Sequence, residues 1–258
     1  LFPAPSYAMY KVMTPIEGSV PLEILLEENW DLDLPAMLQA IQLHQPKVIL
    51  LSYPNNPTGN CFSEEKVLEI LRAAPGVVII DEAYFYFSRK TFLSRLREFP
   101  NLVILRTFSK AGMAGLRVGI LVANRELVTQ LNKIKLPYNL NTVSQSIAKV
   151  VAEHENLIWD QIRRILDERQ GLFEQLALIE GITPFPTEAN FVLFRSARPG
   201  GELYRGLIDE GIWIRNFSDT PYLENCLRVT IGFPRENQEF VEVLRWLMEN
   251  WEGRKGNS

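Results

Sequence analysis

Three short apolar runs set the strongest limit on how this chain can fold. They span Val48–Leu51, Val77–Ile80 and Leu102–Leu105, and each has the length and aliphatic composition of a strand that is buried on both faces. Longer segments with a helical pattern lie between them. Continuous apolar strands that alternate with helices are typical of a mostly parallel sheet covered on both faces. The first half of the chain is therefore predicted to be an α/β domain.

The helices between these runs carry recognisable start and stop signals. A helix is predicted over 35–42, because Asp33 can cap it and Pro35 suits the first turn, where its missing N–H costs nothing. Ser63 is the predicted N-cap of a second helix from residue 64 to about residue 74, which Pro75 and the glycine after it bring to an end. Both helices thus connect neighbouring strands.

The second half of the chain has a different pattern, in which helices dominate and strands are isolated. This indicates a separate α+β layer, and we place the boundary near residue 150, giving domains 1–150 and 151–258. Helices are predicted over 125–136, over 144–179 with a break near His154, over 201–210 and over 237–251, and strands over 190–194 and 227–231.

Composition excludes several functional classes. The 258 residues include 27 Lys plus Arg and 31 Asp plus Glu, and the net charge of −4 offers no basic surface for a nucleic-acid backbone. With 47% hydrophobic and 22% charged residues, the chain is expected to be globular, and no apolar stretch approaches the roughly 20 residues that span a bilayer. Cys61 and Cys226 lie far apart and only His44 and His154 are present, so neither a disulfide framework nor a metal site is predicted.

Chemically capable side chains follow each of the three apolar runs. The first run is followed by Pro-Asn-Asn-Pro-Thr-Gly at 54–59, the second by Asp81 and Tyr84, and the third by Ser109 and Lys110. Taken singly, these are explained by a turn, a helix cap and a solvated surface. Open parallel sheets bind ligands beyond the carboxyl ends of their strands, so the combination predicts one site at that edge.

These residues resemble a known family, the pyridoxal-phosphate (PLP) aminotransferases of fold type I, and within it the histidinol-phosphate aminotransferase branch. The resemblance covers essentially the whole chain. It implies a mostly parallel large domain of the seven-stranded type, a smaller α+β C-terminal domain, the cofactor PLP and a cytoplasmic homodimer that acts on small molecules. The motifs that carry it are P-N-N-P-T-G at 54–59, D-E-A-Y at 81–84, R-T-F-S-K at 106–110, A-G-L-R at 114–117, P-Y-N-L-N at 137–141, E-A-N-F-V-L-F at 188–194 and L-R-V-T-I-G at 227–232.

The resemblance assigns the cofactor-binding roles. Lys110 would form the Schiff base with the cofactor aldehyde and then shuttle the proton, roles that suit a lysine amine. Asp81 would keep the pyridine nitrogen protonated, which the cofactor needs in order to act as an electron sink. Asn56 and Tyr84 would donate hydrogen bonds to the 3-oxygen of the ring, and Tyr7 would stack on its face.

The cofactor phosphate would be held by hydroxyls and a fixed cation. Thr107 and Ser109 are two residues apart, so an extended chain would place them on one face, and Arg117 would supply the charge. Lys110 and Arg117 are separated by one residue fewer than is usual in the family. The resemblance also implies a cis peptide bond between Asn56 and Pro57.

Two arginines are expected to receive the anionic groups of the substrates. By resemblance, Arg228 would bind the substrate carboxylate together with Asn56, and Arg215 would help to receive a substrate phosphate. A guanidinium fork suits both anions.

The expected reaction is the transfer of the amino group between L-histidinol phosphate and 2-oxoglutarate, a step of histidine biosynthesis. A PLP-dependent threonine-phosphate decarboxylase and an aromatic-amino-acid aminotransferase are alternatives that share the motifs. An inactive truncated fragment or a non-enzymatic homologue is the alternative of another class. The chain begins at Leu1 rather than Met, so we expect that an N-terminal part of the large domain, with a phosphate-cradling helix start and an arm to the partner subunit, is absent.

Overall fold

The computed structural model describes residues 1–251, and these divide into two compact units. The first comprises Leu1–Asn56 and Asn60–Ile162, and the second comprises Pro57–Gly59 and the chain from Arg163 onward. The predicted boundary near residue 150 stays a prediction.

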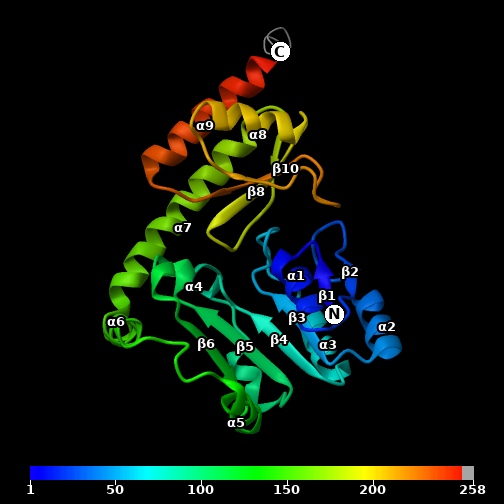
Figure 1. Ribbon diagram of the computed structural model, residues 1–258. Coiled ribbons are helices and arrows are strands. Elements are labelled where there is room, and N and C mark those ends of the chain that lie inside the picture. Colours follow the sequence, from blue (N-terminus) through cyan, green and yellow to red (C-terminus); the bar gives the residue numbers. More distant parts are fainter. Residues whose placement is uncertain (252–258) are drawn as a thin grey trace. The chain divides into compact units, whose positions relative to one another are not determined.

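The first unit is built on a four-stranded sheet with the order β3-β4-β5-β6, whose strands lie side by side in Figure 1. The strands are β3 (Val48–Ser52), β4 (Val77–Asp81), β5 (Leu102–Thr107) and β6 (Gly119–Ala123). The first three pair in parallel, as predicted, whereas β6 runs antiparallel to β5 and was not predicted. The expected α/β architecture with a mostly parallel sheet is confirmed. Two short strands, β1 (Phe2–Ala4) and β2 (Glu23–Leu25), form a separate parallel pair.

Helices connect and flank these strands. Asp33 caps the second helix by accepting a hydrogen bond from the Ala36 N–H at 3.0 Å, as predicted. Ser63 precedes the third helix, but its hydroxyl bonds Glu65 rather than a backbone N–H. The predicted break at His154 separates the sixth helix from the seventh. The helices are α1 (Ala8–Ile16), α2 (Leu34–His44), α3 (Glu64–Ala73), α4 (Phe85–Ser88), α5 (Arg125–Ile134), α6 (Thr142–Glu153) and α7 (Glu155–Ala177), with 3₁₀ turns η1 (Leu93–Arg97), η2 (Ser109–Ala111) and η3 (Ala114–Leu116).

Strand pleating sorts the side chains of β3, β4 and β5 onto two faces. One face packs into the hydrophobic core of the first unit, and it consists of Ile49, Leu51, Val78, Ile80, Leu102 and Ile104. Because side chains alternate along a strand, Ser52, Asp81 and Thr107 belong to the opposite face. The same alternation that builds the core therefore directs three polar residues away from it.

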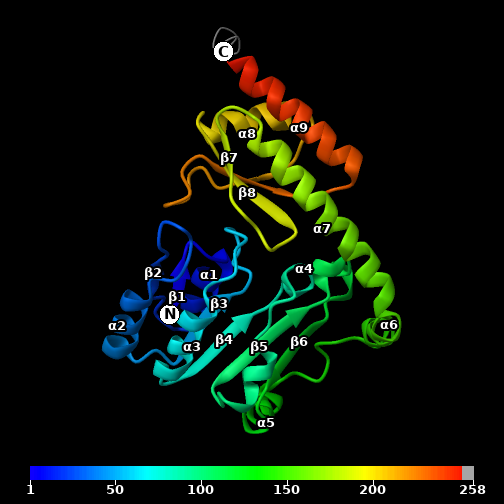
Figure 2. The same ribbon diagram turned by 180° about the vertical axis from the view of Figure 1, so that it is seen from behind.

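The second unit contains a four-stranded sheet with the order β7-β8-β10-β9, in which β8 pairs antiparallel with β7 and β10, and β9 pairs antiparallel with β10. Figure 2 shows helices α8 and α9 along one side of these strands. This arrangement confirms the predicted α+β character of the C-terminal part. The elements are β7 (Ile182–Pro184), β8 (Phe191–Ser196), α8 (Gly200–Asp209), β9 (Arg215–Asn216), β10 (Cys226–Thr230) and α9 (Pro234–Glu249).

Alternation also decides where the arginine of β10 points. Leu227 and Val229 pack into the core that the sheet shares with α7, α8 and α9. Arg228 lies between them in sequence and therefore faces away from that core, with its guanidinium carbon 4.5 Å from the ring centroid of Phe191. No helix within residues 1–251 is both long and apolar enough to cross a bilayer.

We predict that Gly76→Ala destabilises the first unit by about 2 kcal/mol, the usual range for overpacking. A Cβ at Gly76 would lie 2.2 Å from the carbonyl oxygen of Lys47, which accepts the N–H of Val77 at the start of the β3–β4 pair. Denaturant unfolding monitored by circular dichroism would measure the loss.

Gly171→Ala is the matched control. A Cβ at Gly171 would meet no atom within 4 Å, and the residue lies inside α7. The substitution should stabilise the chain by about 0.5–1 kcal/mol, because alanine loses less backbone entropy in a helix than glycine does. Equal effects of the two substitutions would contradict the role given to the close approach at Gly76.

Candidate active site

A cavity of about 540 Å³ opens at the carboxyl ends of β3, β4 and β5. The structure brings together around it every predicted site residue of the first unit. These are Tyr7, Asn56, Asp81, Tyr84, Thr107, Ser109, Lys110 and Arg117. Ser52, Ala83, Leu105, Arg106, Ala114 and Gly119–Leu121 complete the lining.

Strand register explains why the cavity forms here. Ser52 pairs with Asp81 across β3 and β4, and Asp81 pairs with Leu105 across β4 and β5. Thr107, two residues further along β5, pairs with Gly119 of β6. The strands therefore end at one edge and present their outward-facing side chains in a row, as expected for a parallel sheet.

Asp81 is a half-buried carboxylate that lines the cavity. Its Oδ2 accepts a hydrogen bond from the Tyr10 hydroxyl at 3.1 Å, and its Oδ1 accepts one from the Ala83 N–H at 3.1 Å. Burial raises the pKa of Asp81 above its usual value, although both hydrogen bonds and the charge of Lys110 oppose the rise. The hydrogen bonds from Tyr10 and Ala83 therefore offset part of the free-energy cost of burying this charge.

A buried amide fixes the segment that carries Tyr7. Asn55 is fully buried, donates to the Pro5 carbonyl at 3.0 Å and accepts from the Ser6 hydroxyl at 2.8 Å. The loop that bears Asn56 is therefore tied to the chain immediately before Tyr7. Asn55 was not among the predicted site residues, because a proline-rich turn gives no sign of which amide turns inward.

Lys110 lies in η2, directly after β5, and its side chain is exposed. Its Nζ lies 5.6 Å from the centroid of the Tyr84 ring, within the range of cation–π attraction. Tyr84 is 5% exposed and follows Asp81 by three residues at the end of β4. The amine, the phenol and the carboxylate therefore line one cavity.

Thr107 and Ser109 meet by a different route from the one predicted. The chain between them is not extended, because Phe108 has helical dihedral angles. The Ser109 N–H donates to the Thr107 hydroxyl at 3.0 Å, and the two hydroxyl oxygens lie 2.9 Å apart. The expectation of an extended segment was wrong, and a local turn brings the hydroxyls together instead.

Arg117 ends η3 with a left-handed backbone, with φ of 56°, and its side chain is exposed. Positive φ is uncommon for a residue with a Cβ, and it allows the chain to turn sharply from η3 into β6. The turn keeps Arg117 at the cavity, seven residues after Lys110.

A buried ion pair supports this edge of the sheet. Glu82 is 1% exposed and accepts hydrogen bonds from Arg106, Thr91 and the Phe92 N–H at 2.8–3.0 Å. Burial raises the pKa of Glu82, and these donors oppose the rise. The guanidinium of Arg106 also lies 3.5 Å from the ring centroid of Phe85. Because Arg106 lines the cavity, this network holds its side chain in place.

The cis proline was predicted at the wrong position. Asn56–Pro57 is trans, whereas the cis bonds in the described part of the chain precede Pro5 and Pro54. Every peptide bond before a proline has a reduced trans preference, so the local sequence cannot tell which one is cis. Beside this bond, the Ser52 hydroxyl donates to the Pro54 carbonyl at 3.0 Å.

Arg215 and Arg228 belong to the second unit and are direct register partners across β9 and β10. Their guanidinium carbons lie 5.9 Å and 5.5 Å from the ring centroid of Phe217. The two arginines predicted to bind substrate anions are therefore neighbours on one sheet.

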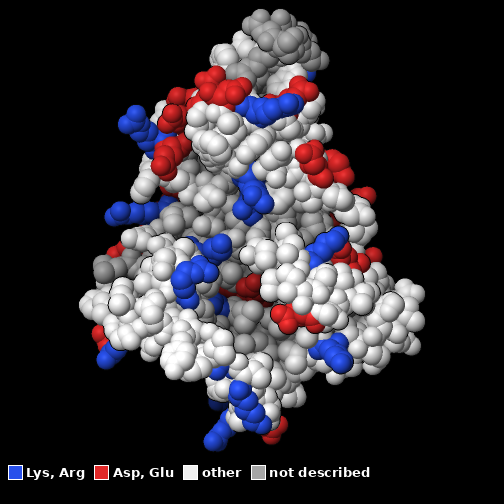
Figure 3. Space-filling model, viewed as in Figure 1, with Lys and Arg blue, Asp and Glu red and all other residues white. Residues whose placement is uncertain are grey.

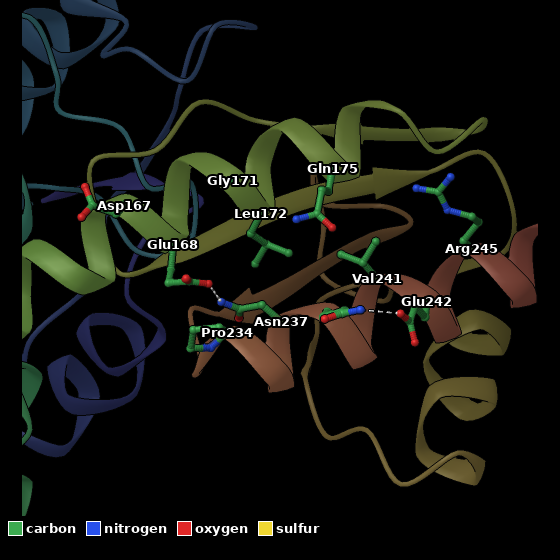
Figure 4. A pocket seen from close by; sticks show the side chains of 11 residues that line it. Asp167, Glu168, Gly171, Leu172, Gln175, Pro234, Asn237, Val241, Glu242 and Arg245 are labelled. Carbon is green, nitrogen blue, oxygen red and sulfur yellow. Dashed lines mark hydrogen bonds between the residues drawn. The ribbon is translucent and has the colours of Figure 1, made fainter.

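A second hollow of about 490 Å³ lies between α7 and α9. Figure 4 shows Asp167, Glu168 and Glu242 around it, with Asn237 bonded to Glu168 at its wall. Among the described residues, its lining contains no lysine and no hydroxyl-bearing side chain.

On the face drawn in Figure 3, basic and acidic side chains are mixed rather than gathered into a field of one sign.

Ser52, which lines the cavity, and Tyr10, which contacts Asp81, are two further residues that the sequence did not reveal. Tyr10 follows Tyr7 by three residues and belongs to α1, which was not predicted. Spacing of three residues on a helix would have been the signal, but Pro15 within this short segment concealed the helix. Ser52 extends β3 one residue beyond the apolar run.

Comparisons with known proteins agree with this arrangement. The sequence profile described as aminotransferase class I and II matches residues 1–244. A histidinol-phosphate aminotransferase from Aquifex aeolicus (strain VF5) is 40% identical over 243 residues, which cover 94% of this chain and 68% of that protein.

Solved structures share the fold. Histidinol-phosphate aminotransferase from Clostridium acetobutylicum has a TM-score of 0.91 and 28% identity, covering 96% of this chain and 77% of the other. The histidinol-phosphate aminotransferase from Sinorhizobium meliloti, in complex with pyridoxal-5'-phosphate, has a TM-score of 0.88 and 22% identity, covering 97% and 71%.

We predict that Asp81→Asn raises the thermal stability of the cofactor-free chain at pH 7. Burial raises the pKa of Asp81, so its neutral form contributes stability that is lost as the pH rises through the folded-state pKa. The substitution removes the buried charge, and its advantage should vanish below the usual aspartate pKa of 3.8. Melting temperatures measured from pH 3 to pH 8 would check this, and a gain that does not depend on pH would contradict it.

Proposed function

Because this chain belongs to the aminotransferase class I and II family, we propose that it is a PLP-dependent aminotransferase that converts L-histidinol phosphate and 2-oxoglutarate to imidazole acetol phosphate and L-glutamate. The observation that carries the proposal is the cavity at the strand ends, where the amine of Lys110 and the half-buried carboxylate of Asp81 line the same space. The named relatives support the choice of substrate.

The cavity residues fit the cofactor. PLP combines an aldehyde, a pyridine nitrogen and a phosphate, and when bound it supplies the electron sink for proton removal next to the amine. Asp81 has one donor on each oxygen, and because a carboxylate oxygen can accept more than one hydrogen bond, it can still bind the ring nitrogen. Asn56 and Tyr84 would bond the ring 3-oxygen, and Tyr7, which is 42% exposed, would stack on the ring.

Lys110 would hold the cofactor aldehyde and then move the proton at the reacting carbon. A side chain that is exposed within the cavity can reach both atoms in turn. A positioned general base of this kind contributes a factor of about 10² to 10⁴ in rate.

The remaining cations and hydroxyls suit anions. Thr107 and Ser109 would bond the cofactor phosphate, with Arg117 as the fixed charge. Arg228 would bind the substrate carboxylate together with Asn56, and Arg215 would receive the substrate phosphate. Guanidinium groups form paired hydrogen bonds with both kinds of anion.

The oligomeric state and the cellular location of the enzyme are also part of the proposal. We expect a homodimer in the cytoplasm, because the resemblance includes a partner subunit that completes the site and the reaction belongs to amino-acid biosynthesis. The division into a large domain over 1–150 and a small domain over 151–258 is part of the same proposal.

Lys110→Ala should abolish both glutamate formation and the absorbance of the covalently bound cofactor. The reason is that no other lysine lines the cavity in the described part of the chain. The matched control is Lys133→Ala, an exposed lysine of α5 whose partner is Gln130, and it should leave both measurements unchanged.

The substrate assay separates the alternatives. Incubating the full-length enzyme with PLP, L-histidinol phosphate and 2-oxoglutarate should yield glutamate. Release of CO₂ from phosphothreonine without glutamate formation would instead establish the decarboxylase. Activity that Lys110→Ala retains would overturn the role of Lys110.

Arg215→Gln should raise the KM for L-histidinol phosphate about tenfold to a hundredfold, the loss expected for one charge-assisted hydrogen bond. Arg228→Gln should raise the KM for glutamate in the reverse direction by a similar factor. Steady-state kinetics in both directions would measure this, with Arg245→Gln on α9 as the control. Equal responses of Arg215→Gln toward both substrates would contradict the separate phosphate role.

A further inference from the structure

Tyr10 contacts a residue of the candidate site but has no part in the proposed roles. Its hydroxyl lies 3.1 Å from Oδ2 of Asp81, while the Ala83 N–H occupies Oδ1 at the same distance. Each carboxylate oxygen therefore has one protein donor, on opposite sides of the group. A carboxylate held by two donors is restricted in rotation and keeps its remaining lone pairs aimed in fixed directions.

The Tyr10 ring is itself held firmly. The residue is 9% exposed, and its ring packs edge-to-face against Phe2 at 6.0 Å and against Tyr7 at 5.6 Å. Tyr10 lies on α1, whose N-cap is Tyr7. The helix α1 thus positions two tyrosines: Tyr7 at its start, which is expected to stack on the cofactor, and Tyr10, whose hydroxyl contacts Asp81.

We propose that Tyr10 is a positioning residue of this site, acting through Asp81: its hydroxyl keeps that carboxylate ionised and oriented toward the cavity. The inference rests on the proposed function, because Asp81 has a catalytic use only if it faces the protonated ring nitrogen of PLP. Tyr10 itself is not expected to touch the cofactor.

The Tyr10 hydroxyl lowers the pKa of Asp81. Burial raises the pKa of Asp81, and the Tyr10 hydrogen bond is the largest of the effects that lower it. The other groups acting on this pair are Lys110, whose charge lowers the pKa of Asp81, and Tyr7 and Ser52 beside the phenol. All three remain when the hydroxyl is removed. Loss of the Tyr10 hydroxyl should therefore move the titration of Asp81 to higher pH.

The charge of Asp81 determines whether the proton between Asp81 and the pyridine nitrogen stays on the nitrogen. An ionised Asp81 leaves the proton on the ring nitrogen, where the electron sink needs it. Without the Tyr10 donor, Asp81 becomes a stronger base and competes for that proton. The variant should therefore hold the cofactor less well in mildly acidic solution and catalyse more slowly.

Tyr10→Phe removes the hydroxyl and retains the ring that packs against Phe2 and Tyr7. PLP affinity, measured by cofactor absorbance and fluorescence from pH 5 to pH 9, should decline on acidification in both proteins. In the variant the decline should begin about one pH unit higher, since a hydrogen bond to a charged group is worth about one pKa unit or more. The kcat should fall about tenfold at pH 7, with a smaller change in substrate KM.

Phe2→Leu is the matched control, because it loosens the packing around the Tyr10 ring and leaves the hydroxyl in place. If packing alone matters, both variants should weaken PLP binding by a factor that does not change with pH. That result would overturn the inference.

A second readout does not depend on the cofactor. The carboxyl carbon of Asp81 can be followed by ¹³C NMR in the cofactor-free chain labelled at aspartate, with Asp81→Asn identifying the signal. Tyr10→Phe should move its titration midpoint upward by about one unit, and Phe2→Leu should move it less.

The outcomes separate the two claims. Upward shifts of both the NMR titration and the affinity profile support the role of Tyr10. An unshifted NMR titration, or a shifted one with an unchanged affinity profile, overturns it while leaving the proposed function intact. Failure of the unsubstituted full-length enzyme to bind PLP at any pH overturns the proposed function and the inference together.

Discussion

The in-register pairing of β3, β4 and β5 is the constraint on which the site of the first unit depends. Parallel strands that pair in register end at one edge, and their pleat sends alternate side chains to opposite faces. The aliphatic residues of one face build the core, so the polar residues at the strand ends must turn to the other face. A shift of one residue in this register would bury Asp81 in the core and expose Ile80. The same backbone hydrogen bonds between the strands therefore determine both which side chains are buried and how the candidate site residues are arranged.

This arrangement has an electrostatic cost at Asp81. A carboxylate is placed where burial raises its pKa, and the surrounding chain supplies donors from Tyr10 and Ala83 to keep it usable. Glu82, the next residue, is buried as well, but its donors come from Arg106, Thr91 and the backbone and hold the sheet edge together. Two adjacent acidic residues thus receive different tasks, because alternation along β4 and the turn after it direct them to different partners.

Much of the architecture was predictable from local patterns. The three apolar runs, the Asp33 cap and the break at His154 were all recovered, because strand length, capping chemistry and helical periodicity are written in neighbouring residues. The family motifs also named eight of the residues that line the cavity. By contrast, α1 and β6 were missed. Pro15 obscures α1, and the glycine that opens β6 is typical of a turn rather than of a strand.

The sequence alone determined the order of the elements, the residue types at the strand ends and the family resemblance, since each depends on composition and spacing along the chain. The tertiary structure decided which groups meet. It placed the cis bond before Pro54 rather than Pro57, joined Thr107 to Ser109 through a turn instead of an extended segment, and set the Tyr10 hydroxyl on Asp81 across 71 positions of the chain. The Tyr10–Asp81 contact is non-local. It depends on register, burial and packing between segments, which no pattern of neighbouring residues encodes.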